Sequence, residues 1–95
     1  MKELYSYANK LTQLYNLPPN LEILNCQHNQ ITQLDNVSTS LKELWCDGNQ
    51  LTQLDNLPYN LEKLYCNRNQ IIKLDNLPLN LKKLMCGVNK LTQLR

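Results

Sequence analysis

Four cysteines and one histidine are the residues of this sequence whose types could carry chemistry. The cysteines, Cys26, Cys46, Cys66 and Cys86, recur at intervals of twenty residues. His28 follows the first of them by two positions, so a Cys–His nucleophile pair or a thiolate metal site has to be considered. A working pair also needs an accessible thiol and a third group that orients the base. The chemistry therefore depends on where the chain places these side chains.

The cysteines occupy one position of a repeat that fills the chain. The segment LKELWCDGNQLTQLDNLPYN, from Leu41 to Asn60, returns as LEILNCQHNQITQLDNVSTS from Leu21, as LEKLYCNRNQIIKLDNLPLN from Leu61, as LKKLMCGVNKLTQL from Leu81 and, more loosely, as MKELYSYANKLTQLYNLPPN from Met1. A fixed period of this length is typical of stacked units that cannot bury an apolar face alone. We predict one domain over residues 1–95, with repeats 1–20, 21–40, 41–60 and 61–80 and a partial repeat 81–95.

The leucines three and four residues apart could also form a helical stripe. An α-helix turns by about 100° per residue, so a period of twenty would place successive stripes on opposite faces. A proline also returns in several repeats, and an interior proline costs a helix about 3 kcal/mol. The residues around Trp45 instead alternate with the period of a strand, so that Leu44 and Cys46 face inward and Trp45 faces outward. We expect one short strand per repeat and a parallel sheet of about five strands.

The pattern L-x-x-L-x-C-x-x-N-x-[LI]-x-x-L-x-x-L-P-x-N resembles the short leucine-rich repeat, and it covers the whole chain. The resemblance implies a right-handed solenoid, which family convention places in the α/β class although it would be mostly β with little or no helix. The strands would line the concave face, and extended, polyproline-like segments would form the convex side. The repeat length and the Leu-Pro pair resemble compact arrays of secreted bacterial effectors. The cysteine and the Leu-Asp pair resemble cysteine-containing bacterial repeats, so both subfamilies stay open.

The repeating apolar positions form the predicted core. They are Leu21, Leu24, Cys26, Ile31, Leu34 and Val37, then Leu41, Leu44, Cys46, Leu51, Leu54 and Leu57, then Leu61, Leu64, Cys66, Ile71, Leu74 and Leu77. Cysteines on neighbouring parallel strands would lie about 4.8 Å apart, whereas the Cβ atoms of a disulfide lie about 3.8 Å apart. We therefore expect reduced, buried thiols in a line, which do not form a tetrahedral metal site. With no third partner for His28 and only two glycines in the chain, we predict no catalytic residue, no metal and no cofactor, and hence no enzyme.

Asparagine and charge also follow the repeat. Asn9, Asn29, Asn49, Asn69 and Asn89 share one position, at which each strand must turn inward. An amide offers both donors and an acceptor, so this column is expected to satisfy backbone groups that the bend leaves unpaired. Just before each strand, lysine and glutamate alternate at Lys2, Glu22, Lys42, Glu62 and Lys82. Opposite charges on neighbouring strands support the register of a sheet.

The outward positions indicate a binding surface. One row across the strands reads Tyr5, Asn25, Trp45, Tyr65 and Met85, and the next reads Tyr7, Gln27, Asp47, Asn67 and Gly87. Tryptophan, tyrosine and arginine are enriched at binding hot spots. We predict a protein or peptide ligand on the concave face, contacted by Tyr5, Tyr7, His28, Trp45, Asp47, Tyr65, Arg68 and Met85. The alternative is cross-strand aromatic packing that only stiffens the sheet.

Charge and hydropathy limit the other partners. The net charge of +2 is mixed in sign, and Glu3, Glu43 and Asp47 share the aromatic face, so we do not expect nucleic acid there. No apolar run has the roughly 18 residues of a membrane span, and no secretory signal is evident, which predicts an intracellular, cytoplasmic protein with no membrane partner. If the chain is part of a secreted effector, the host cytosol is its expected location.

A structural or self-associating repeat fragment of a longer, effector-type protein is the alternative function. Uncapped solenoid ends expose core and strand edges, which predicts either a longer native array or an end-to-end homo-oligomer. Head-to-tail stacking would place Lys82 beside Lys2 of another copy, and this like-charge contact favours a closed two-fold arrangement over a fibre.

Overall fold

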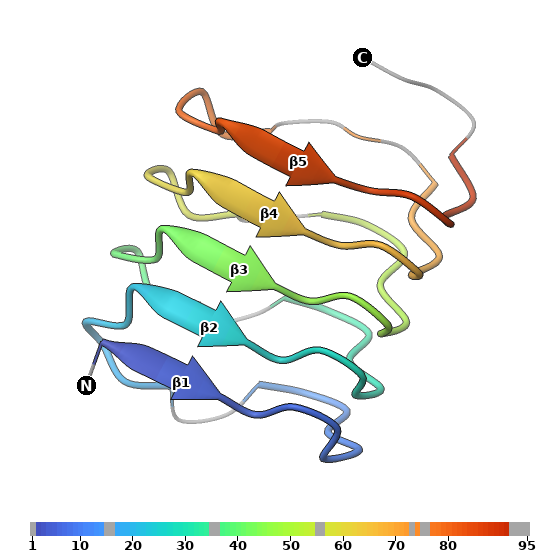
Figure 1. Ribbon diagram of the computed structural model, residues 1–95, viewed down its shortest axis with the longest axis horizontal. Coiled ribbons are helices and arrows are strands. Elements are labelled where there is room, and N and C mark those ends of the chain that lie inside the picture. The colour runs from blue at the N-terminus through green and yellow to red at the C-terminus, as the bar shows by residue number, and fades with distance from the viewer. Residues whose placement is uncertain are drawn as a thin grey trace.

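Each repeat forms one turn of a coil and contributes one short strand. The computed structural model describes residues 2–14, 17–34, 37–54, 57–72, 74 and 77–91. The strands are β1 (Glu3–Tyr5), β2 (Ile23–Asn25), β3 (Glu43–Trp45), β4 (Lys63–Tyr65) and β5 (Lys83–Met85). They form one sheet in the order β1-β2-β3-β4-β5 (Figure 1). The described part of the chain contains no helix, so the predicted mostly-β solenoid is confirmed.

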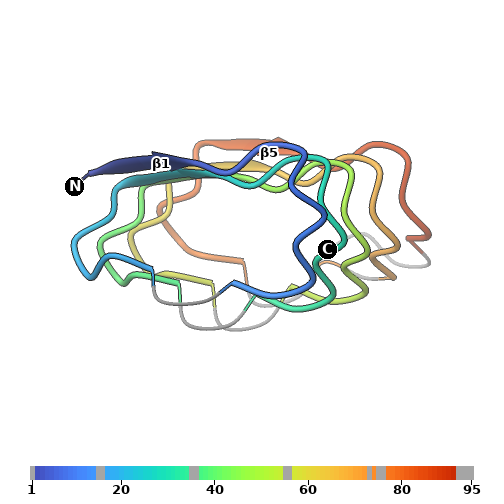
Figure 2. The same cartoon turned by 90° about the horizontal axis from the view of Figure 1, so that it is seen from below.

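The register of the sheet follows the sequence period. All four neighbouring pairs are parallel, and Leu4 lies opposite Leu24, which lies opposite Leu44. Viewed along the stack, the sheet forms one side of each coil and the return segments form the other (Figure 2). A twenty-residue step therefore places equivalent side chains of adjacent turns side by side.

The core fills the space between the sheet and the return segments. Leu24, Leu44 and Leu64 are fully buried, as are the three cysteines that follow them. The predicted core is less well buried at the end of each return segment, where Val37, Leu57 and Leu77 are half-buried and pack against the buried cluster. Cys86, in the last described turn, is a free thiol like the other three, but it is only half-buried.

The asparagine column closes each turn, as predicted. Asn49 Nδ2 donates to the carbonyl oxygens of Cys26 and Cys46, both at 3.0 Å, and Asn49 Oδ1 accepts from the Ile31 N–H at 3.0 Å. Asn69 and Asn89 repeat these bonds one and two turns later. In the described residues, no buried side-chain nitrogen or oxygen lacks a hydrogen-bond partner. From the second turn onward, one amide per turn thus joins two adjacent coils.

The position before this asparagine has a left-handed backbone in every turn. Its φ angles are 57° at Ala8, 58° at His28, 68° at Gly48, 57° at Arg68 and 52° at Val88. In the first four turns the N–H group of this residue donates at 2.9 Å to a carbonyl of the following turn, for example from His28 to Asp47. The conformation is therefore part of the ladder between turns. Of these five residues only glycine adopts it without steric cost.

Replacing Val88 with glycine is expected to raise the free energy of unfolding by about 1 kcal/mol, because a β-branched residue is strained in this region and Val88 is 72% exposed, so little packing is lost. The shift should appear as a higher urea midpoint with an unchanged m-value. Ala8→Gly is the control and should give a smaller gain. A lower midpoint for Val88→Gly would contradict the strain argument.

Candidate functional site

The outward row runs across all five strands. The register aligns Tyr5 with Asn25, Asn25 with Trp45, Trp45 with Tyr65, and Tyr65 with Met85. Tyr5 is 61% exposed and Met85 43% exposed, while Trp45 and Tyr65 are half-buried. The sheet thus presents large apolar side chains in one line on its outer face.

Trp45 and Tyr65 stack on each other in the middle of this line. Their ring centroids lie 3.8 Å apart and their planes are inclined by 19°. The Lys83 ammonium nitrogen lies 5.6 Å from the Tyr65 ring centroid, within the range of a cation–π contact. One face of each stacked ring is therefore used for packing across strands, and the ring edges remain at the surface.

A carboxylate two residues earlier on the same strand holds each of two aromatic side chains. The Tyr5 hydroxyl donates to Glu3 Oε1 at 3.1 Å, and Trp45 Nε1 donates to Glu43 Oε1 at 3.3 Å. The hydrogen bond to Glu3, followed by its negative charge, raises the pKa of Tyr5. Lys63 Nζ lies 4.0 Å from the other oxygen of Glu43. These glutamates were not among the predicted site residues, although a strand's two-residue period already places them on the same face.

Asp47 organises the second row. Its Oδ2 accepts from Gln27 Nε2 at 2.6 Å and its Oδ1 accepts from the Asn67 N–H at 2.7 Å. Asn67 in turn accepts from the Gly87 N–H at 2.6 Å. Both oxygens of Asp47 are engaged in joining neighbouring turns, so its contribution to a ligand site would be its negative charge.

The structure brings Tyr7 and His28 together at the end of the sheet. Their ring centroids are 5.3 Å apart in an edge-to-face arrangement. The His28 ring also covers Gly48, where an added Cβ would lie 2.5 Å from His28 Nδ1. Arg68 is exposed at the equivalent turn position two turns further along. His28 is exposed whereas Cys26 is fully buried, so the two do not form an accessible pair.

Comparison with known proteins agrees with this geometry. Residues 19–59 match a model of leucine-rich repeats in two copies. The solved structure of YopM from Yersinia enterocolitica WA-314 superposes with a TM-score of 0.81 and 38% sequence identity over 87% of this chain. The chain is a compact, bacterial-type leucine-rich-repeat array. It spans 18% of that YopM chain. A search of curated proteins gives no match.

Three thiols of the leucine-rich-repeat array, those of Cys26, Cys46 and Cys66, are buried in a way that lowers their reactivity. Burial, with a smaller effect of the Asp47 charge, raises the pKa of Cys26 to about 12. Burial also raises the pKa of Cys66 to about 12, and it raises that of Cys46 well above its ordinary value. The nucleophile and metal ligand is the thiolate, which these side chains do not form near neutral pH. Across the described ranges, no three His, Cys, Asp or Glu side chains are grouped to hold a metal ion.

Iodoacetamide at pH 8 is expected to modify Cys86 first, because Cys86 is half-buried while the other three thiols are fully buried and protonated. Peptide mapping by mass spectrometry over time would give the order. In 8 M urea, which unfolds the chain, the four rates should converge. Modification of Cys46 as fast as Cys86 in the native protein would contradict the buried column.

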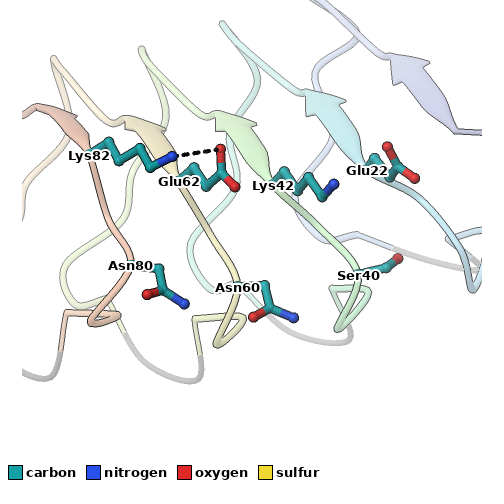
Figure 3. A pocket seen from close by; sticks show the side chains of 7 residues that line it. All are labelled: Glu22, Ser40, Lys42, Asn60, Glu62, Asn80 and Lys82. Atoms are coloured by element: carbon teal, nitrogen blue, oxygen red, sulfur yellow. Dashed lines mark ion pairs between the residues drawn. The ribbon is translucent and has the colours of Figure 1, made fainter.

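A second, polar surface lies where the chain enters the strands. A groove of about 450 Å³ is lined by Glu22, Ser40, Lys42, Asn60, Glu62, Asn80 and Lys82 (Figure 3). Lys82 Nζ lies 3.9 Å from Glu62 Oε1, and Lys42 lies in the same line between Glu62 and Glu22. The charges alternate along neighbouring turns as predicted. Their attraction supports the register of the sheet, which gives the groove a structural role. Among the residues placed by the structure, no helix is long and apolar enough to cross a membrane.

Proposed function

We propose that this leucine-rich-repeat array is a non-catalytic interaction module that binds a protein or peptide on the concave face of its sheet. The outward row carries the proposal, since it exposes Tyr5 and Met85 on either side of the Trp45–Tyr65 stack. Tryptophan and tyrosine supply much of the binding energy in protein interfaces. Leucine-rich-repeat arrays are extended scaffolds of this kind, in which stacked turns create a continuous surface.

The chemistry of the side chains supports a binding role over catalysis. The buried thiols are protonated, and the exposed His28 ring packs against Tyr7 and Gly48 while Cys26 is buried. Asp47 uses both carboxylate oxygens in hydrogen bonds to neighbouring turns. The array also carries free thiols, which suits a reducing compartment such as the cytoplasm, or the host cytosol if the array belongs to a secreted effector.

Capture from a cell lysate by the immobilised array, with and without Trp45→Ala, would test the proposal. The wild type and a Tyr59→Ala control should retain the same proteins, because Tyr59 is exposed but lies outside the outward rows. Trp45→Ala should lose them while remaining folded by circular dichroism. A variant that is destabilised yet captures the same proteins would leave the stacked rings with only a stiffening role and would refute the proposal.

Self-association is a second candidate because the first turn carries an apolar hollow. The hollow has a volume of about 240 Å³ and is lined by Leu4, Ser6, Leu11, Gln13, Leu14, Leu17 and Leu24. A second copy that covered this surface would bury the leucines in a closed two-fold dimer. Light scattering of the 95-residue chain at high concentration should then give the mass of a dimer. A monomeric mass would exclude this candidate and leave the concave-face proposal unaffected.

A further inference from the structure

The charges on the concave face are separated along the stack. We consider the third, fifth, seventh and eighth positions of each repeat, which form the outer face of the strands and the turn that follows. In the first three turns these positions hold three carboxylates, Glu3, Glu43 and Asp47, and no lysine or arginine. In the fourth and fifth turns they hold three cations, Lys63, Arg68 and Lys83, and no carboxylate. One half of the surface therefore favours a cation and the other half favours an anion, and the two halves meet at the Glu43–Lys63 ion pair, whose charged atoms lie 4.0 Å apart.

The acidic half also contains a gap in the aromatic row. Tyr65 covers one face of Trp45, but on the other side the next strand carries Asn25. The Asn25 Oδ1 atom accepts from the N–H group of Gln27 at 3.1 Å, so this short side chain is bonded to the backbone just after its own strand. Beyond it lies Tyr5, which is 61% exposed. Two aromatic side chains thus stand on either side of a strand that carries no ring.

The width of this gap suits a positively charged side chain. Two strand spacings place the backbones of Tyr5 and Trp45 roughly 10 Å apart. A cation midway would lie about 5 Å from each ring, and cation–π attraction operates within about 6 Å of a ring centroid. Glu3 and Glu43 lie in the adjoining row, separated by Ile23. The hydrogen bond to Glu3 raises the pKa of Tyr5 most, followed by the charge of Glu3, and the charge of Glu43 adds the smallest effect.

We propose that the concave face binds an extended segment of a partner protein that places an arginine or lysine between Tyr5 and Trp45 and an aspartate or glutamate over Lys63 and Lys83. This inference rests on the proposed function and adds the chemistry of the ligand. The Lys83 ammonium group is exposed beside the Tyr65 ring, where it can meet a carboxylate at the surface.

The spacing of the two charges in the ligand follows from the sheet. The gap lies over β2, and the two lysines lie on β4 and β5, which is about two and a half strand spacings or roughly 12 Å away. An extended peptide advances about 3.3 Å per residue. The basic and acidic residues of the ligand should therefore be about four positions apart, in either chain direction.

Selection of random twelve-residue peptides displayed on phage would test this spacing. Peptides enriched by the wild-type array should share a basic and an acidic residue about four positions apart. The double variant Glu3→Gln/Glu43→Gln should lose the preference for the basic residue and keep that for the acidic one. Enriched peptides without a basic residue, or an unchanged preference in the variant, would overturn the inference while the concave-face module stood. Failure to enrich any peptide, together with failure of capture from the lysate, would refute both.

The most enriched peptide, labelled with fluorescein, allows a quantitative test by fluorescence anisotropy. Replacing its arginine with citrulline, or its lysine with norleucine, should weaken binding about tenfold, because a cation–π contact and a surface ion pair are both lost. Tyr5→Leu should weaken it several-fold, and Tyr59→Leu should not, although the two tyrosines are similarly exposed at 61% and 68%. Equal affinity for the Tyr5→Leu variant and the wild type would overturn the assignment of Tyr5.

Discussion

Replacing Asn49 with alanine is expected to lower the free energy of unfolding by about 3 kcal/mol. The side chain bonds to three backbone groups in buried surroundings, namely the carbonyl oxygens of Cys26 and Cys46 and the N–H group of Ile31. An alanine would leave these groups without a partner and without access to water, at about 1 to 3 kcal/mol for each group that cannot relax. The two carbonyls belong to adjacent turns, so losing the Asn49 side chain weakens both its own turn and the contact of that turn with the preceding one.

Asn9→Ala provides the matched control. Asn9 occupies the same repeat position but is exposed, and within the described residues its side chain donates to Ser6 Oγ, at 3.3 Å. Its removal should cost less than about 0.5 kcal/mol, as for most surface substitutions. Urea unfolding followed by circular dichroism would measure both variants. Similar losses of unfolding free energy for Asn9→Ala and Asn49→Ala would contradict this explanation. They would mean that the buried hydrogen bonds of Asn49 do not stabilise the fold more than an exposed asparagine does.

The period of the sequence was sufficient to predict the sheet, its register and the column of asparagines. Copies of one segment can stack only if equivalent residues lie side by side, so Leu44 must follow Leu24 in the core and Asn49 must follow Asn29 at the turn. The alternation around Leu44 then decides which side chains face inward. These features follow from repetition and do not depend on the identity of any outward residue.

The left-handed turn at the eighth position could not be predicted in the same way. The residues found there are Ala8, His28, Gly48, Arg68 and Val88, which share no preference, and glycine alone is suited to the conformation. From the sequence, His28 and Arg68 are therefore predicted as ligand-binding residues, with no role for their backbone. The structure shows that their backbone also joins adjacent turns, because the ladder imposes the φ angle whatever the side chain.

The outward row shows where prediction from spacing ends. Spacing places Trp45 and Tyr65 on neighbouring strands, but the 3.8 Å stack depends on side-chain rotamers and on the carboxylate that holds the indole. The gap beside Tyr5 likewise depends on the Asn25 side chain, which bonds to the backbone N–H group of Gln27 just after its strand. A sequence can thus identify which residues share a face, while the surface available to a ligand depends on how those residues contact one another.

Replacing Leu44 with alanine is expected to lower the free energy of unfolding by about 4 kcal/mol. Leu44 is fully buried in the central turn, between Leu24 and Leu64 in the equivalent positions of its neighbours. Truncation removes apolar contacts and leaves a cavity, and the paired strands on both sides limit how far the core can collapse into it. Leu84→Ala, at the same repeat position in the fifth turn, should cost about half as much because Leu84 is only half-buried.

The position of the loss should also change how the array unfolds. Each strand of the structure contacts only the strands of the adjacent turns, so the coupling between the two halves passes through the central turn. Leu44→Ala should therefore reduce the m-value of urea unfolding as well as the midpoint, because the halves begin to unfold separately. Leu84→Ala should lower the midpoint with little change in the m-value. Equal losses of unfolding free energy and equal m-values in the two variants would contradict a core in which each turn is supported by its neighbours. The cost would then depend on the residue type and not on its place in the stack.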